Sequence, residues 1–322
     1  MSSAYFNTYS HGITAIDTGY QYPHYDNAYL VVENGRAAFI DTGVNASVPR
    51  LLAALDQQGL TPEDVDWVLL THIHLDHAGG AGSLMAQLPN ARLGVHARGV
   101  RHMIDPTQLM SAVIAVYGEE TARAEYGTLV PIPAERIETL GEGSEIQLSG
   151  RTFSIMDSPG HARHHICIWD AHSAAWFTGD AFGLCPPVFR TASGHCILPS
   201  TTPSQFDPVA YHTTVHKLLA PQPRAVFPTH SGEVLHPERL APYLLAQIDA
   251  MVEVAQRGGA DTDGAPLLEE SFAQIYTHSL LSQGWQGSVS ELKSLMGIDL
   301  GLNVEGVKIW LDQLQKSSAA KN

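Results

Sequence analysis

The chain has 322 residues, of which 44% are hydrophobic, so it is long enough for one large domain or two. Its formal net charge is −15 with 18 Lys and Arg in total, which argues against the basic surfaces that bind nucleic acid or an anionic membrane. There is no apolar run of the roughly 18–20 residues that a transmembrane helix needs, no signal-peptide pattern, and too few cysteines for a disulfide framework. We therefore expect a cytoplasmic protein that acts on a small molecule, with neither a nucleic-acid nor a membrane partner.

The first part of the chain alternates strand-like and helix-like segments. Residues 26–43 predict a β-hairpin, because two apolar runs flank Asn34-Gly35, a strong signal for a two-residue turn. Apolar residues at helical spacing predict a helix over 46–60 that ends near Gly59. Further along we expect a series of alternating elements: a buried strand over 65–72, a helix over 79–89, a strand over 91–97 and an amphipathic helical insert over 104–127.

After Pro131 the pattern changes to several strands separated by turns, within residues 136–160, 165–180 and 223–232. From about Pro237 onward it becomes helical, with expected helices over 237–258, 267–284, 288–296 and 303–316. We therefore predict a catalytic domain over residues 1–236 and a C-terminal helical segment over 237–322. That segment is a cap or a dimerisation element, so a homodimer is one possible assembly.

The segment "LLTHIHLDHAGG", residues 69–80, carries a dense group of metal-binding side chains. Imidazole and carboxylate suit divalent ions such as Zn²⁺ and Fe²⁺. His72 and His74 are two positions apart, so on an extended strand end they point to the same side and can hold one ion. Asp76 and His77 follow where the chain turns into a helix, displaced enough to serve a neighbouring ion. The alternative is a solvated, histidine-rich turn.

The same segment matches the HxHxDH signature of the metallo-β-lactamase superfamily. Four further segments resemble motifs of this superfamily and occur in its order: "AFIDTG" (38–43), "DSPGHARHH" (157–165), "FTGDAFG" (177–183) and "FPTHSG" (227–232). Together they cover roughly residues 12–236. The resemblance implies an α+β fold, the αββα four-layer sandwich in which two sheets pack face to face with helices outside, here with a C-terminal helical extension.

Carried over to this chain, the resemblance implies seven metal ligands. The first ion would be held by His72, His74 and His161, the second by Asp76, His77 and His230, with Asp180 bridging both. Asp41 resembles an aspartate that hydrogen-bonds near the ligands, although a turn or helix-capping role is the alternative. His165 is expected to pack under the site without binding metal.

The implied cofactors are two divalent ions, Zn²⁺ or Fe²⁺, with Mn²⁺ as a further possibility. Such a pair shares a water and lowers its pKa, so that a bridging hydroxide attacks the substrate. Asp76 is expected to hold or shuttle the proton of that hydroxide.

The substrate is less closely specified. "HARHHICIW" (161–169) is similar to the third-histidine region of glyoxalase II, a thioester hydrolase, but the few C-terminal lysines form no cluster like the one that holds glutathione there. The whole chain looks like metallohydrolases related to the flavodiiron metal domain and to lactonase-like and thioesterase-like enzymes. We therefore expect hydrolysis of a small ester, lactone or thioester. The alternatives are a di-iron redox enzyme of flavodiiron type and a metal-bound regulator without turnover.

The substrate pocket is expected to form from two loops, residues 20–27 and 182–199, with the insert 104–127 as a lid. Ordinary loop packing is the alternative for each side chain. The candidate pocket residues are Tyr22, His24, Tyr25, Phe182, Phe189, Arg190 and His195.

Overall fold

The computed structural model describes residues 5–201, 203–258 and 265–319. They form two compact units. The first contains the chain up to Asp157 together with His164–Gly179 and Arg224–Leu235. The second contains Ser158–Arg163, Asp180–Pro223 and the chain from His236 onward. The second unit therefore combines the predicted helical segment with two stretches from earlier in the chain.

The first unit is built on two β-sheets. The first sheet has the strand order β1-β2-β3-β4-β5-β6-β7. Its strands are β1 Phe6–Thr8, β2 Ile13–Asp17, β3 Asn27–Glu33, β4 Arg36–Ile40, β5 Val65–Leu69, β6 Arg92–His96 and β7 Ile137–Leu140. The second sheet has the order β13-β12-β11-β10-β9-β8. Its strands are β8 Glu145–Leu148, β9 Arg151–Asp157, β10 Ile166–Asp170, β11 Ala175–Gly179, β12 Ala225–Pro228 and β13 Val234–Leu235.

The predicted hairpin is confirmed as β3 and β4. Asn34 and Gly35 have φ of 47° and 76°, the pair of positive values that a tight hairpin turn requires. From β4 to β7 neighbouring strands run parallel, so the carboxyl ends of β4 and β5 lie at the same edge of the sheet. Asp41 and the histidine motif follow directly after those two strands.

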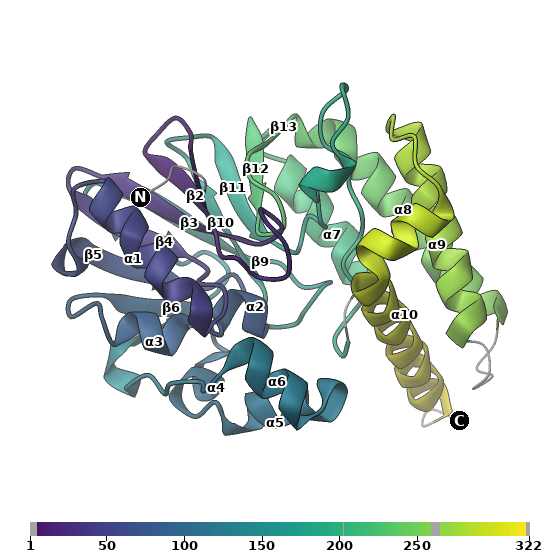
Figure 1. The fold of residues 1–322 in the computed structure, drawn as a ribbon, viewed down its shortest axis with the longest axis horizontal. Helices are drawn as coiled ribbons and strands as arrows, with labels where there is room; N and C mark the ends of the chain where they lie inside the picture. The colour runs from purple at the N-terminus through teal and green to yellow at the C-terminus, as the bar shows by residue number, and fades with distance from the viewer. Residues whose placement is uncertain (1–4, 202, 259–264, 320–322) are drawn as a thin grey trace. The chain divides into compact units, whose positions relative to one another are not determined.

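A hydrophobic core lies between the two sheets. The rings of Tyr29, Phe177 and Phe227 meet there, with centroids 5.1–5.5 Å apart. A second core covers the other face of the first sheet, where Phe39 packs with Leu51 and Leu84. The helices that supply it, α1 (Val48–Gln57) and α3 (Ala81–Met85), lie against this sheet in Figure 1.

The predicted insert is confirmed as helical, but it is divided. It contains α4 (Val100–Ile104), α5 (Thr107–Tyr117) and α6 (Glu119–Tyr126). Gly118, with φ of 81°, separates α5 from α6. The helix predicted over 79–89 is shorter than expected and spans only α3. Short 3-10 helices are formed by Asn45–Ser47, Pro62–Asp64, Ala134–Arg136 and Pro187–Phe189.

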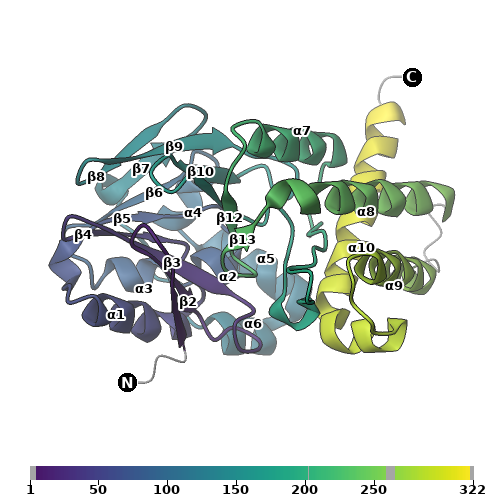
Figure 2. The same cartoon turned by 90° about the horizontal axis from the view of Figure 1, so that it is seen from above.

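The second unit is mainly helical, with α7 (Pro208–Leu219), α8 (Pro237–Gly258), α9 (Ala265–Ser282) and α10 (Val289–Ala319) (Figure 2). The two last predicted helices both fall within α10, which is kinked at Met296 (φ −125°, ψ 19°), where the first of them was predicted to end. Helix α7 is absent from the sequence prediction. It begins with Pro208 after Asp207, whose carboxylate accepts a hydrogen bond from Ala210 N at 3.0 Å. None of the described helices is both long and apolar enough to cross a membrane.

A buried ion pair connects β9 and β10 of the second sheet. Arg151 on β9 donates from Nε to Asp170 Oδ1 at 3.0 Å and from Nη2 to Asp170 Oδ2. Its Nη1 also donates to His11 O at 2.6 Å. Asp170 accepts a further hydrogen bond from Ser173 Oγ. Because both charged groups are buried, removal of one leaves the other without compensation.

We predict that Arg151→Met lowers the free energy of unfolding by about 3–5 kcal/mol. The control is Arg92→Met, which breaks an exposed pair with Glu138 and should cost about 0–1 kcal/mol. Urea unfolding followed by tryptophan fluorescence measures both, since Trp169 and Trp176 lie on neighbouring strands of this sheet. Equal costs for the two variants would contradict the assignment.

Candidate metal centre

The histidine motif begins where β5 ends. His74 is still extended, with φ −65° and ψ 149°, and α2 (Leu75–Ala78) starts at the next residue. The turn is held against the loop after β4, because Thr42 N donates to His77 O and Gly80 N donates to Gly43 O, both at 2.8 Å. A Cβ on Gly80 would lie 2.8 Å from Val44 O, so this close approach requires a glycine.

The rings of His72 and His74 lie next to each other. His72 Nε2 lies 2.9 Å from His74 Nδ1, and His72 is fully buried. Two nitrogens bound to one tetrahedral Zn²⁺ at about 2.0–2.1 Å stand about 3.3 Å apart. The separation of these two nitrogens is close to that value, so the pair fits two ligands of one ion.

Asp76, His77 and His230 form a second group, whose ligand atoms all lie within 4.8 Å of one another. Asp76 Oδ2 is 3.6 Å from His77 Nε2 and 3.5 Å from His230 Nε2. His230 follows β12, so the group joins residues from opposite ends of the first unit's sequence. A carboxylate oxygen and two imidazole nitrogens are a suitable donor set for a divalent ion.

The other ring nitrogen of each of these histidines faces an oxygen. His77 Nδ1 lies 2.8 Å from Asp41 Oδ2, and His230 Nδ1 lies 3.3 Å from Tyr25 O. Nδ1 therefore carries the proton and donates, which leaves the Nε2 lone pair for a metal. This orientation of a ligand imidazole by an oxygen acceptor is the usual arrangement in protein metal sites.

Asp41 connects the ends of three strands. Its Oδ1 accepts from Thr71 N at 2.8 Å, and its Oδ2 accepts from Thr71 Oγ1 at 2.8 Å and Thr229 Oγ1 at 2.9 Å. Its own φ is 56°, an uncommon value for a residue other than glycine. Sequence reasoning placed Asp41 near the ligands but missed both threonines. The signal was present, since each threonine directly precedes a ligand, His72 or His230.

The pKa values of Asp76 and Asp26, two carboxyl groups of this region, shift in opposite directions. Burial raises the pKa of Asp76, but the imidazoles of His77, His230 and His74 outweigh it and hold that pKa well below its usual range. Asp26 behaves in the opposite way, because burial raises its pKa to about 7 despite the imidazoles of His230 and His77. Asp76 is therefore ionised near neutral pH, as a metal ligand must be.

His161 and Asp180 belong to the second unit, where they lie together. His161 Nε2 is 3.7 Å from Asp180 Oδ2, and His161 Nδ1 donates to Ser200 O at 3.1 Å. Asp180 also accepts from Ser200 Oγ at 3.2 Å and, at its backbone oxygen, from Tyr211 OH at 2.9 Å. His161 Nε2 is thus available to a metal. That His161 and Asp180 share a centre with His72 and His77 stays a prediction.

Two more histidines pack beside the first pair. The ring of His165 stacks on His72 with centroids 4.8 Å apart, the packing position predicted for it. His164 lies edge-on to His74 at 5.4 Å and is 7% exposed. Sequence reasoning gave His164 no role, although it stands in the quoted "HARHH" segment. Its position next to a ligand makes it a further candidate site residue.

Two of the predicted pocket residues of the first unit, Tyr25 and Tyr22, form an aromatic group beside His230. The Tyr25 ring lies 4.6 Å from the His230 ring and 4.5 Å from that of Tyr22. Tyr25 is only 1% exposed, so it packs against the ligand, whereas Tyr22 and His24 are half-buried.

The predicted pocket residues of the second unit also comprise buried side chains and more exposed ones. Phe182 and Phe189 are fully buried, and Phe189 packs edge-on against Trp285 at 5.3 Å. Arg190 is exposed and His195 half-buried, and burial and the Arg190 charge lower the pKa of His195 to about 4. That any of these side chains contacts a substrate stays a prediction.

The curated relatives that this chain matches include several named hydroxyacylglutathione hydrolase. "Hydroxyacylglutathione hydrolase" from Stenotrophomonas maltophilia is 34% identical over 163 residues, which is 50% of this chain and 48% of the relative. The chain thus spans about half the length of that protein.

Solved structures show a similar fold. A metallo-β-lactamase family protein from Thermus thermophilus is 22% identical with a TM-score of 0.62, over 84% of this chain and 92% of the other. A β-lactamase domain protein from Burkholderia ambifaria is 19% identical with a TM-score of 0.62, over 97% of this chain and 90% of the other. These likenesses confirm the predicted fold class.

The family model of the metallo-β-lactamase superfamily matches residues 22–246, a range that contains all seven predicted ligands. With two packed sheets and a histidine motif at the ends of their strands, the chain belongs to the metallo-β-lactamase superfamily.

Proposed function

We propose that this protein is a metal-dependent hydrolase that uses two divalent ions, Zn²⁺ or Fe²⁺, to cleave a thioester or a related small ester or lactone. The observation that carries the proposal is the orientation of the ligand histidines. In His77 and His230 the Nδ1 proton is donated to an oxygen while Nε2 faces the Asp76 carboxylate. Such preorganisation by hydrogen bonds is typical of imidazoles that bind a metal.

When bound, the two ions would supply Lewis-acid chemistry, lowering the pKa of a water and polarising the carbonyl oxygen of the substrate. The residues of the chain would position the reactants. Asp76 Oδ2 lies 3.6 Å from His77 Nε2 and 3.5 Å from His230 Nε2, so its carboxylate stands beside the proposed metal ligands. We therefore assign Asp76 to orienting the attacking water and holding its proton.

The proposed substrate class follows from the names of the relatives and from the lysines of the C-terminal segment. Several matched relatives are named hydroxyacylglutathione hydrolase, which supports an acyl substrate. The C-terminal lysines give no support for glutathione itself. Lys293 Nζ, for example, is 2.6 Å from Glu270 Oε2, so its ammonium is already paired. We propose a thioester whose thiol portion is not glutathione.

The first prediction concerns the metal. His74→Ala should lower thioester hydrolysis by at least about 100-fold and lower the bound metal, because a neutral methyl group cannot replace an imidazole ligand. Metal content is read by elemental analysis of protein purified without added metal. The control is His212→Ala, which removes an imidazole that is bonded to Asp249 in the second unit and should change neither value. Unchanged metal and activity in His74→Ala would refute the site.

The second prediction concerns Asp41. Asp41→Asn places an amide N–H against the Thr71, Thr229 and His77 donors, so it should reduce metal affinity about 10–100-fold. Competition with a chelator at several metal concentrations measures this affinity independently of activity. Asp64→Asn is the matched control, because Asp64 also accepts from a threonine but is only half-buried and lies outside the ligand group. Equal affinities in the two variants would show that Asp41 does not position the ligands.

The third prediction concerns the reaction. With two Zn²⁺ or Fe²⁺ ions per chain, the protein should hydrolyse at least one of a panel of acyl thioesters, aryl esters and lactones. It should leave a phosphodiester panel unchanged. The loss of turnover in His74→Ala separates this activity from a contaminant. Turnover of phosphodiesters alone would contradict the proposed substrate class.

A further inference from the structure

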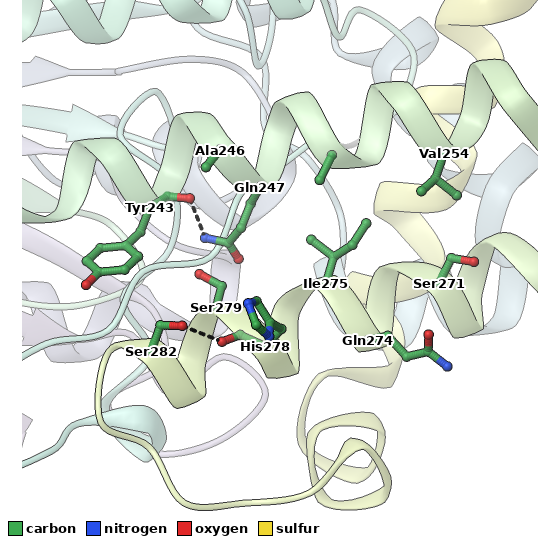
Figure 3. A pocket seen from close by; sticks show the side chains of 11 residues that line it. Tyr243, Ala246, Gln247, Val254, Ser271, Gln274, Ile275, His278, Ser279 and Ser282 are labelled. Carbon is green, nitrogen blue, oxygen red and sulfur yellow. Dashed lines mark hydrogen bonds between the residues drawn. The ribbon is translucent and has the colours of Figure 1, made fainter.

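A groove lies between α8 and α9 in the second unit, with a volume of about 550 Å³ (Figure 3). Small-molecule sites typically occupy roughly 300–1,000 Å³. The two helices leave this space open because their facing side chains are small. Helix α8 contributes Ala246 and Ala250, one turn apart, and α9 contributes Ser271 and Ser279.

The groove has apolar walls and a polar floor. Val254 and Ile275 are half-buried and stand on opposite walls. Gln247 and Ser279 are buried, at 2% and 8% exposed, and they lie deepest. The residues that line the groove include no lysine, arginine, aspartate or glutamate.

The amide of Gln247 has a fixed orientation. Its Nε2 donates to Ile197 O at 3.1 Å and to Tyr243 O at 3.0 Å, so the nitrogen cannot exchange places with the oxygen. Among the described residues, Oε1 accepts no hydrogen bond. Figure 3 shows this oxygen on the side of the amide that faces α9. A buried acceptor without a donor is unfavourable, so a bound donor would stabilise this arrangement.

We propose that the groove binds a small, uncharged and mostly apolar molecule that presents one O–H or N–H group to Gln247 Oε1. The apolar walls recognise its body and the glutamine recognises its donor. Because no lysine, arginine, aspartate or glutamate lines the groove, we assign the affinity to the apolar walls and to the hydrogen bond with Gln247. The groove lies within the second unit, and this inference does not depend on the proposed hydrolase function.

The test compares two probes of similar size. 2-Naphthol carries an O–H donor, and 2-methoxynaphthalene does not. In fluorescence titrations of the full chain, 2-naphthol should bind at one saturable site, about fivefold more tightly than its methyl ether. Ala250→Leu fills the groove and should weaken binding of both probes at least tenfold. Gln256→Leu introduces the same residue type at an exposed position of the same helix, outside the groove, and should leave binding unchanged.

Three outcomes would overturn the proposal. One is the absence of saturable binding, and another is equal binding of the two probes, which would remove Gln247 from recognition. The third is a dimer in sedimentation velocity that Ala250→Leu dissociates, because a second copy of the chain would then occupy the groove. Ser271→Leu fills the groove from α9, so it replaces Ala250→Leu if the melting temperature shows that the latter variant is unfolded.

Discussion

The carboxylate of Asp41 is the interaction on which the ligand arrangement of the first unit depends. A buried carboxylate is unfavourable unless donors surround it, and here the donors come from Thr71, Thr229 and His77. These residues lie after β5, after β12 and in α2. Satisfying one charge therefore fixes three separate segments relative to one another. The hydrogen bond from His77 Nδ1 to Asp41 also keeps the proton on Nδ1, so that His77 Nε2 can bind a metal.

The sheets make this arrangement possible. Parallel strands β4 and β5 bring Asp41 and the histidine motif to the same edge, and β12 brings His230 there from a distant part of the sequence. The ligands thus stand at the ends of rigid strands, while the connecting loops are free to differ. In a chain with net charge −15, this cluster combines histidines with the carboxylates of Asp41 and Asp76. The uncharged Nε2 atoms can bind a cation, and a bound cation would polarise the carbonyl group of a substrate.

Local signals predicted much of this structure. Asn34-Gly35 fixed the hairpin because few residue pairs adopt its positive φ values, and the HxHxDH spacing located the centre because its residues are adjacent in sequence. Helix α7 was missed because its amphipathic pattern is weak and its start rests on a single capping residue, Asp207. The roles of Thr71 and Thr229 were also missed. Their place directly before His72 and His230 was a local signal, but their hydrogen bonds reach Asp41, 30 and 188 positions away, so their partner could not be read from the sequence. The burial of Tyr25 and Phe189 likewise follows from tertiary packing.

Two metal ions should bind to the imidazole nitrogens oriented in this way. Anomalous diffraction from crystals of the metal-loaded protein, recorded above and below the absorption edge of the metal found by elemental analysis, locates them. Two peaks are expected, one within bonding distance of His72 Nε2 and His74 Nδ1 and the other beside Asp76, His77 Nε2 and His230 Nε2. A single peak, or peaks remote from these atoms at full metal occupancy, would contradict this arrangement of two ions.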